Sequence, residues 1–262
     1  MQTESIKEAI MNFNDESKVK DIALSNPAAT QVLEDAGVDY CCGGEKSLHD
    51  ACLHADVSAE EILQRLRENS KDVTSDDGNW ISAPLHVLTQ HIRETHHQYV
   101  RQAIARIQPL LDKVEVKHGG NYPEIAEIRT LFTQVGRDMI AHMQKEEQML
   151  FPYIDALEKA RNTNCSVEPP FFQTVKNPIR MMMKEHDAAG ELVRRIRTTS
   201  SEYTAPIDAC TSYKALYEAL REFEADLHQH VHLENNILFP RAVELESLPS
   251  GSNATPVALL IH

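Results

Sequence analysis

The feature that most constrains this chain is a hydrophobic stripe near the C-terminus that contains a histidine and a glutamate. Read as a helix, the stripe has steps of four and three residues, the spacing of a helix packed along the seam of a bundle. Its residues are Leu216, Leu220, Phe223, Leu227, His230, Glu234 and Ile237. Buried imidazole and carboxylate groups are unfavourable unless a partner satisfies them. His230 and Glu234 therefore predict a bound partner, and a metal ion would serve.

The same pattern occurs a second time, earlier in the chain. In the same register, its residues are Ile128, Phe132, Val135, Met139, His142, Glu146 and Met149. Each copy then continues into Leu-Phe-Pro. A single His-x-x-x-Glu is a weak signal, because such pairs are common on helix surfaces. Two copies in register within an apolar stripe indicate a duplicated helical hairpin that carries ligands.

Further histidines fit this duplication. His186 lies on an apolar face with Ile179, Met183, Val193 and Ile196. It precedes His230 by nearly the interval that separates His97 from His142. The duplication therefore predicts a ligand at or beside His97. Periodicity alone does not decide whether His96 or His97 is the ligand. His96 continues the apolar stripe that precedes the pair in the sequence, whereas His97 is in register with the apolar stripe that follows it.

Glycine and proline are scarce and helix-forming residues dominate, so the predicted fold class is all-α. Long amphipathic segments with short connections predict an up-down-up-down four-helix bundle. The expected bundle helices cover about residues 82–115, 123–160, 172–200 and 209–246. A small N-terminal helical domain is expected to hold short helices near 18–25, 27–36, 46–54 and 58–68. The predicted division is an arm at 1–17, the small domain at 18–68, a linker at 69–80, the bundle at 81–247 and a flexible tail at 248–262.

The net charge of −14 argues against nucleic-acid and anionic-membrane partners. The chain has no apolar run long enough to span a membrane and no recognisable signal peptide. Five cysteines without a disulfide framework fit a reducing compartment. We therefore expect a cytoplasmic protein, and a homodimer is one assembly compatible with the sequence.

Histidine and carboxylate without thiolate suit iron or manganese better than a structural zinc ion. The order His-x-x-x-Glu differs from the Glu-x-x-His of ferritin-like di-iron proteins and favours a hemerythrin-like site. A lone histidine on a helix is most often solvated or hydrogen-bonded. A four-helix bundle that binds no metal is therefore the alternative to a metal site. The histidines assigned to that ordinary class are His49, His54, His86, His91, His228, His232 and His262.

Several motifs resemble those of the Repair of Iron Centers family, which are hemerythrin-like di-iron proteins. They are residues 39–44 (DYCCGG), Trp80 with 82–85 (SAPL), 142–152 (HMQKEEQMLFP), 185–192 (EHDAAGEL) and 230–242. The resemblance covers about residues 18–246. It implies a small domain with a cysteine pair ahead of a hemerythrin-like bundle. Ordinary hemerythrins have other residues at the positions of Gly190 and Glu234, which puts simple oxygen carriage in doubt.

The resemblance also implies two iron ions joined by an oxo or hydroxo bridge. The ligands it implies are His97, His118, His142, Glu146, His186, His230 and Glu234. It selects His97 over His96 and adds His118, which has no counterpart in the second half of the duplication. Five imidazoles, two bridging carboxylates and the bridging oxygen would leave one open position on two six-coordinate irons. The acidic neighbours Glu147 and Asp187 are expected either to surround the ligands or to lie at the surface.

The adjacent Cys41 and Cys42 admit two interpretations. The pair could be a buried turn, or a mobile thiol pair that receives iron or nitric oxide from the di-iron site. A disulfide between neighbours would be strained and easily reduced. Cys52, Cys165 and Cys210 are isolated in the sequence and are expected to be structural.

The function implied by the resemblance is repair of iron–sulfur clusters damaged by nitric oxide or oxidants, by supplying iron. The expected partners are the damaged iron–sulfur proteins and small diatomic ligands, nitric oxide and oxygen. One alternative is an enzyme that reduces nitric oxide to nitrous oxide at the same site. Another is a module that senses or stores oxygen or nitric oxide. The sequence does not establish whether the protein is an enzyme.

Overall fold

The structure is a computed structural model that describes residues 12–25, 27–69 and 80–248. Across these residues the fold is all-α, as predicted, with one isolated β-bridge between Lys18 and Ser47. The predicted arm, linker and tail lie wholly or mainly outside the described residues. Among the helices described, none has the length and apolar character needed to cross a membrane.

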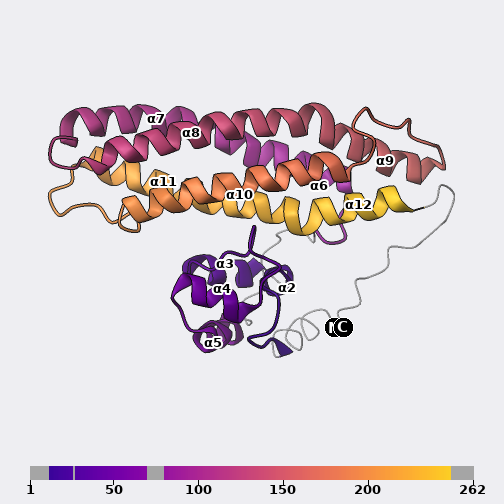
Figure 1. Ribbon diagram of the computed structural model, residues 1–262, viewed down its shortest axis with the longest axis horizontal. Helices are drawn as coiled ribbons and strands as arrows, with labels where there is room; N and C mark the ends of the chain where they lie inside the picture. The colour runs from indigo at the N-terminus through magenta and orange to yellow at the C-terminus, as the bar shows by residue number, and fades with distance from the viewer. Residues whose placement is uncertain (1–11, 26, 70–79, 249–262) are drawn as a thin grey trace.

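Most of the described chain forms a bundle of four long helical rods, three of which contain a π-helical turn, marked η (Figure 1). The rods are α6 (Leu85–Ile92), η1 (Arg93–His97) and α7 (Gln98–His118); α8 (Glu124–Lys145), η2 (Glu146–Leu150) and α9 (Phe151–Thr163); α10 (Lys176–Thr199); and α11 (Thr211–His232), η3 (Leu233–Leu238) and α12 (Phe239–Ser247). Their short connections make successive rods antiparallel, so the up-down-up-down prediction is confirmed.

The predicted seam forms the centre of this bundle. Every residue of the C-terminal stripe, from Leu216 to Ile237, is buried. Phe132 of α8 and Phe223 of α11 pack edge to face with ring centroids 5.2 Å apart. The buried histidines and glutamates of the stripes are therefore flanked by an apolar core.

Two methionines depart from the predicted stripes. Met149 is only partly buried, whereas the next residue, Leu150, is 1% exposed. The π-helical turn η2 accounts for this, because a wider turn moves the inward-facing position by one residue. Met183 is 42% exposed and Met182 takes its place in the core.

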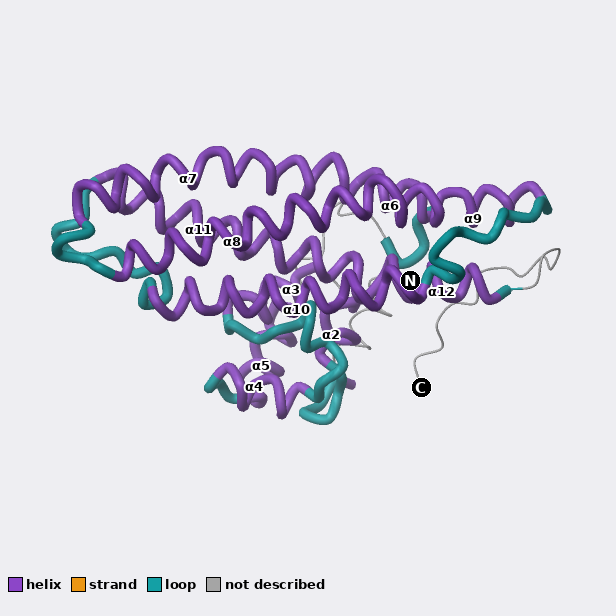
Figure 2. The backbone as a smooth tube through the Cα atoms, turned by 45° about the horizontal axis from the view of Figure 1, so that its top comes forward, coloured by secondary structure: helices purple, strands orange, loops and turns teal. Residues whose placement is uncertain are grey.

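Four short helices form a smaller unit on one side of the bundle (Figures 1 and 2). They are α2 (Val19–Ser25), α3 (Pro27–Asp35), α4 (Leu48–Ala55) and α5 (Ala59–Asn69), and they share a hydrophobic core of their own. The unit contacts α11 and η3 of the bundle. His228 Nδ1 lies 2.9 Å from a Glu34 carboxylate oxygen, and Asn236 Nδ2 donates to the Tyr40 carbonyl oxygen at 3.0 Å.

Candidate metal centre

Six of the seven predicted ligands meet in the middle of the bundle. They form two groups, one of His97, Glu146, His230 and Glu234, and one of His142, Glu146, His186 and Glu234. Within each group the ligand atoms all lie within 4.8 Å of one another. Both glutamates belong to both groups, which is the arrangement of carboxylates that bridge two metal ions.

All four rods contribute to this cluster. His142 and Glu146 are one turn apart at the junction of α8 and η2, and His230 precedes Glu234 in the same way at the junction of α11 and η3. His97 ends η1, and His186 lies in α10. Each π-helical turn contains a candidate ligand, and such turns are frequent at functional sites. The π-helical turn η1 also explains why the adjacent His96 and His97 are both buried.

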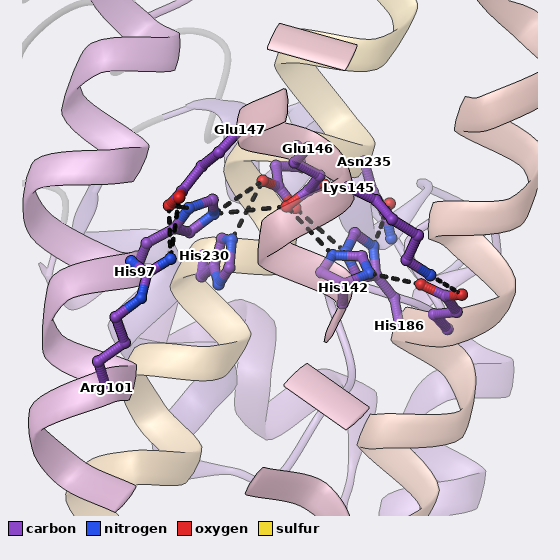
Figure 3. Close-up of polar contacts among 11 residues, drawn as sticks. His97, Arg101, His142, Lys145, Glu146, Glu147, His186, His230 and Asn235 are labelled. Carbon is purple, nitrogen blue, oxygen red and sulfur yellow. Dashed lines mark hydrogen bonds and ion pairs between the residues drawn. The ribbon is translucent and has the colours of Figure 1, made fainter. Parts of the chain in front are cut away.

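The imidazole Nε2 atoms converge on the carboxylates of Glu146 and Glu234, and Figure 3 shows His97 and His142 turned toward Glu146. His97 Nε2 lies 3.4 Å and His142 Nε2 3.3 Å from Glu146 Oε2. On the second carboxylate, His186 Nε2 lies 3.1 Å from Oε2 of Glu234 and His230 Nε2 lies 3.1 Å from Oε1. Each carboxylate is therefore shared by one histidine from each group.

The cluster has buried polar atoms that the protein alone does not satisfy. All six side chains are at most 1% exposed. Among the described residues, the buried atoms without a hydrogen-bond partner include His97 Nε2, both carboxylate oxygens of Glu146 and Glu234 Oε2. Leaving such atoms unpaired in a core is costly. Cations bound between them would satisfy all of these atoms, so the residues present fit a metal site.

The electrostatics also favour bound cations. Burial raises the pKa of Glu234, but His230 and His186 outweigh burial and hold that pKa well below its ordinary value. Burial lowers the pKa of His142, but the neighbouring carboxylates, Glu146 first, raise it to about 10. In the metal-free protein the paired carboxylates thus hold a proton on His142. A metal ion would displace that proton, so metal binding and protonation compete here.

A second layer of polar groups orients three of the imidazoles. His97 Nδ1 donates to Glu147 at 2.7 Å, and His142 Nδ1 donates to Glu185 at 2.9 Å. His186 Nδ1 donates to the Asn235 side-chain oxygen at 2.9 Å. With Nδ1 donating outward, Nε2 keeps a lone pair for a metal, as is usual for metal-binding histidines.

From the sequence, Glu147 had two possible places, and Glu185 and Asn235 were not expected to orient candidate ligands. The duplication could have indicated two of these residues. Glu147 directly follows Glu146, and Asn235 directly follows Glu234 in the second copy. Each of the two accepts a hydrogen bond from a histidine of the preceding rod. Asp187 is exposed to solvent.

The expectation that His118 is a metal ligand is wrong in this structure. The helix α7 continues without a break to His118, which places it roughly 30 Å along the axis from His97. His118 Nε2 instead lies 3.1 Å from Cys210 Sγ. Periodicity could not exclude His96 as a ligand, but it does not join the cluster. Its ring stacks on that of His230 with centroids 5.6 Å apart, and its Nδ1 forms a hydrogen bond with Asp226.

The cysteine pair lies beside the cluster. Cys41 packs into the bundle core, and its Sγ lies 3.9 Å from Cys42 Sγ. Gly190 lies one helical turn beyond His186. A Cβ atom added at Gly190 would lie 3.9 Å from Cys42 Sγ, so the thiol is close to this turn of the helix. Asn235, which accepts from His186, also donates to the Cys41 carbonyl oxygen at 3.2 Å. A single amide therefore connects the cysteine segment to a candidate ligand.

Comparison with known families agrees with this architecture. Residues 88–242 match the family described as the Hemerythrin HHE cation binding domain. Residues 15–70 match the ScdA_N domain, described as a domain of unknown function. The first match covers the cluster, and the second covers the cysteine pair.

Several named proteins are similar over nearly their whole length. A "Probable iron-sulfur cluster repair protein" of Haemophilus influenzae is 34% identical over 87% of this chain and 97% of its own. "Iron-sulfur cluster repair protein YtfE" of Citrobacter koseri is 33% identical over 89% of this chain and 99% of its own. The YtfE of an Escherichia coli strain is 33% identical, with 85% and 94% covered. The chain therefore belongs to the hemerythrin-like family of iron–sulfur cluster repair proteins.

Proposed function

We propose that this chain binds two iron ions in the buried cluster and helps to restore iron–sulfur clusters damaged by nitric oxide or oxidants. The observation that carries the proposal is the sharing of Glu146 and Glu234 between two groups of ligands. Imidazole and carboxylate without thiolate suit iron. The names of the relatives, iron-sulfur cluster repair proteins, support the same process.

The donor set supports a labile centre. Each ion would have two imidazoles and two shared carboxylates, His97 and His230 on one side and His142 and His186 on the other. Because His118 is absent from the cluster, the protein would supply fewer donors than the sequence predicted. With a bridging oxide or hydroxide added, each six-coordinate ion would keep an open position. Bound iron would supply a place for a small ligand and could be passed to a client protein.

The chain's own residues would set how tightly iron is held. Glu147 is itself held by Arg101 at 2.9 Å, and Glu185 is paired with Lys145. These cations keep the two carboxylates in place to orient His97 and His142. The cluster can therefore be preorganised before metal enters, while burial excludes water from the ligands.

We further propose that the small unit of residues 18–68 presents Cys41 and Cys42 to the cluster as transfer thiols. The Cys42 hydrogen bond and burial raise the pKa of the Cys41 thiol well above its ordinary value. Cys41 would therefore stay protonated until iron or nitric oxide approaches. A Cys41→Ala/Cys42→Ala variant should keep its iron but lose activity toward a damaged client.

The test of repair is reactivation of a nitrosylated [4Fe–4S] dehydratase by the iron-loaded protein. We expect recovery of dehydratase activity together with loss of iron from this protein, and little recovery with a Glu146→Leu variant. Equal recovery with free ferrous iron at the same concentration would refute a specific role. Metal analysis of the purified protein checks the number of iron ions separately.

A second candidate function is reduction of nitric oxide, favoured by two adjacent ion positions that would each keep one open coordination position. Anaerobic addition of nitric oxide to the ferrous protein separates the two candidates. Release of nitrous oxide over many turnovers supports an enzyme. A stable nitrosyl adduct without turnover supports a sensing or storage module.

A further inference from the structure

A second cluster of reactive groups lies at the end of the bundle remote from the candidate metal centre. His118 is the last residue of α7, and Cys210 is the N-cap residue of α11. His118 Nε2 lies 3.1 Å from Cys210 Sγ. The two residues share the wall of a pocket of about 250 Å³ with Lys113 and Lys117. Neither residue contacts the candidate ligands.

Three features of this place stabilise a thiolate at Cys210. Cys210 is the N-cap residue of the 22-residue helix α11, so the N–H groups of the first turn, those of Tyr213 and Ser212, favour negative charge on its sulfur, although the Tyr213 N–H itself donates to the Cys210 carbonyl oxygen at 3.0 Å. The imidazole of His118 and the charge of Lys117 act in the same direction. Together, led by the Tyr213 N–H, they lower the pKa of Cys210 to about 7. Helix N-termini and neighbouring His or Lys are the surroundings that activate cysteines.

The remaining cysteines are placed differently. The pKa of Cys41 is raised by the Cys42 hydrogen bond and by burial, and that of Cys52 is raised by burial. Cys165 is exposed, and its Sγ contacts a backbone carbonyl oxygen, Thr163 O, at 3.6 Å. Cys210 therefore combines solvent access with a hydrogen-bonded imidazole.

The pocket also has the charge to recognise an anion. Lys113 and Lys117 are exposed at its rim, in a protein whose net charge is −14. The nearby carboxylate of Asp208 accepts a hydrogen bond from Tyr122 at 2.5 Å. Asp208 keeps its negative charge in that bond, so the attraction of a reactant that carries carboxylates would come from Lys113 and Lys117.

We propose that Cys210 and His118 form a thiolate–imidazole pair that undergoes thiol–disulfide exchange with anionic low-molecular-weight disulfides. In this step the Cys210 thiol gives its proton to His118 and its sulfur attacks one sulfur of the disulfide, so a new S–S bond forms and the original S–S bond breaks. The departing thiolate leaves with the electron pair of the broken bond and takes a proton from His118. The product is a mixed disulfide on Cys210, formed without any contribution from the metal centre.

The magnitude follows from the thiol chemistry. A pKa of about 7 in place of 9.0 raises the thiolate fraction at pH 7 roughly fiftyfold, while intrinsic nucleophilicity falls roughly eightfold. Cys210 should therefore react about sixfold faster at pH 7 than an ordinary exposed thiol. The lysines should add a preference for an anionic reagent.

The test is incubation of the iron-loaded full chain with glutathione disulfide at pH 7, followed by mass spectrometry of intact protein and peptides. We expect the adduct on Cys210 first, its loss in Cys210→Ser, and normal labelling in the matched control Cys165→Ser. His118→Asn should keep its iron, slow the exchange, and move the midpoint of the pH–rate profile upward from about 7.

A charge comparison completes the design. Glutathione disulfide should react faster than the cationic disulfide cystamine, and a Lys113→Ala/Lys117→Ala variant should reduce the difference. Equal rates for Cys210 and Cys165 at pH 7, or a pH midpoint that His118→Asn leaves unchanged, would overturn the proposal. An adduct that forms equally with both disulfides would overturn the recognition of anions.

Discussion

Asn235 offers the sharpest test of how the cysteine segment and the candidate metal centre are connected. Its side-chain oxygen accepts from His186 Nδ1 at 2.9 Å, and its nitrogen donates to the Cys41 carbonyl oxygen at 3.2 Å. Asn235→Leu removes both bonds with little change of size. Asn235→Asp keeps the acceptor for His186 and removes the donor to Cys41. The two variants therefore separate the orientation of His186, a candidate metal ligand, from the attachment of the cysteine segment.

The expected magnitudes follow from the two bonds. Loss of a polar group that orients a metal-binding histidine commonly reduces metal affinity about 10–100-fold, which equals about 1.4–2.7 kcal/mol. Asn235→Leu should show such a loss. Asn235→Asp should hold iron at least as well as the wild type, because an ionised acceptor strengthens the bond from His186. In both variants the Cys41 segment loses a bond that contributes about 0.5–1.5 kcal/mol.

Two assays read these effects separately. Iron transfer to a competing chelator measures metal affinity, and alkylation of Cys41, which is 6% exposed, measures opening of its segment. For iron affinity, Asn236→Asp is the matched control, since Asn236 donates to the Tyr40 carbonyl oxygen and to no candidate ligand. If Asn235→Leu kept wild-type iron affinity, the orienting role would be refuted. Unchanged alkylation of Cys41 in both variants would refute the connection.

Three further predictions concern the shared carboxylate, the interface and the cysteine loop. Glu146→Leu removes an atom pair common to both ligand groups, so iron content should fall to background; retention of half the iron would contradict sharing. Burial lowers the pKa of His228, but Glu34 outweighs burial and raises it. Protonated His228 should therefore stabilise the fold fully below its unfolded-state pKa of about 6.5, and this stabilisation should be lost as the pH rises through the folded-state pKa. Urea unfolding midpoints should show this loss, and Glu34→Gln should remove most of it. Gly44→Ala would place a Cβ atom 2.9 Å from a side-chain carbon and from a backbone oxygen, so it should destabilise the small unit by about 1–3 kcal/mol. Gly120→Ala is the control: its Cβ atom would have nothing within 4 Å, so thermal unfolding should not change.

The helices and the buried polar seam could be predicted from the sequence because helical periodicity is a local property of the chain. The repeat of His142 and Glu146 as His230 and Glu234 placed both pairs on inward faces, and the structure buries them as predicted. The duplication likewise led to His186 and to the neighbourhood of His97. Any helix with this stripe must bury it, so the polar residues within it required a partner whatever the details of packing.

Other features depend on contacts between segments far apart in sequence, and only the tertiary structure decided them. The resemblance assigned His118 to the metal, but the unbroken α7 carries it to Cys210. The π-helical turn η2 buries Leu150 in place of Met149. Which position faces inward after such a turn depends on packing against other rods, because a single-helix period assumes an unbroken α-helix.

The position of the cysteine pair is the clearest case. In the sequence, Cys41 and Cys42 are an isolated motif in a small unit, and no pattern relates them to His186. In the structure, one amide side chain, Asn235, bonds to both His186 and the Cys41 segment. The sequence by itself determined the rods and the candidate ligands on their inner faces, because those follow from spacing along each helix. The tertiary structure decided which groups surround those ligands, because that depends on how separate parts of the chain pack together.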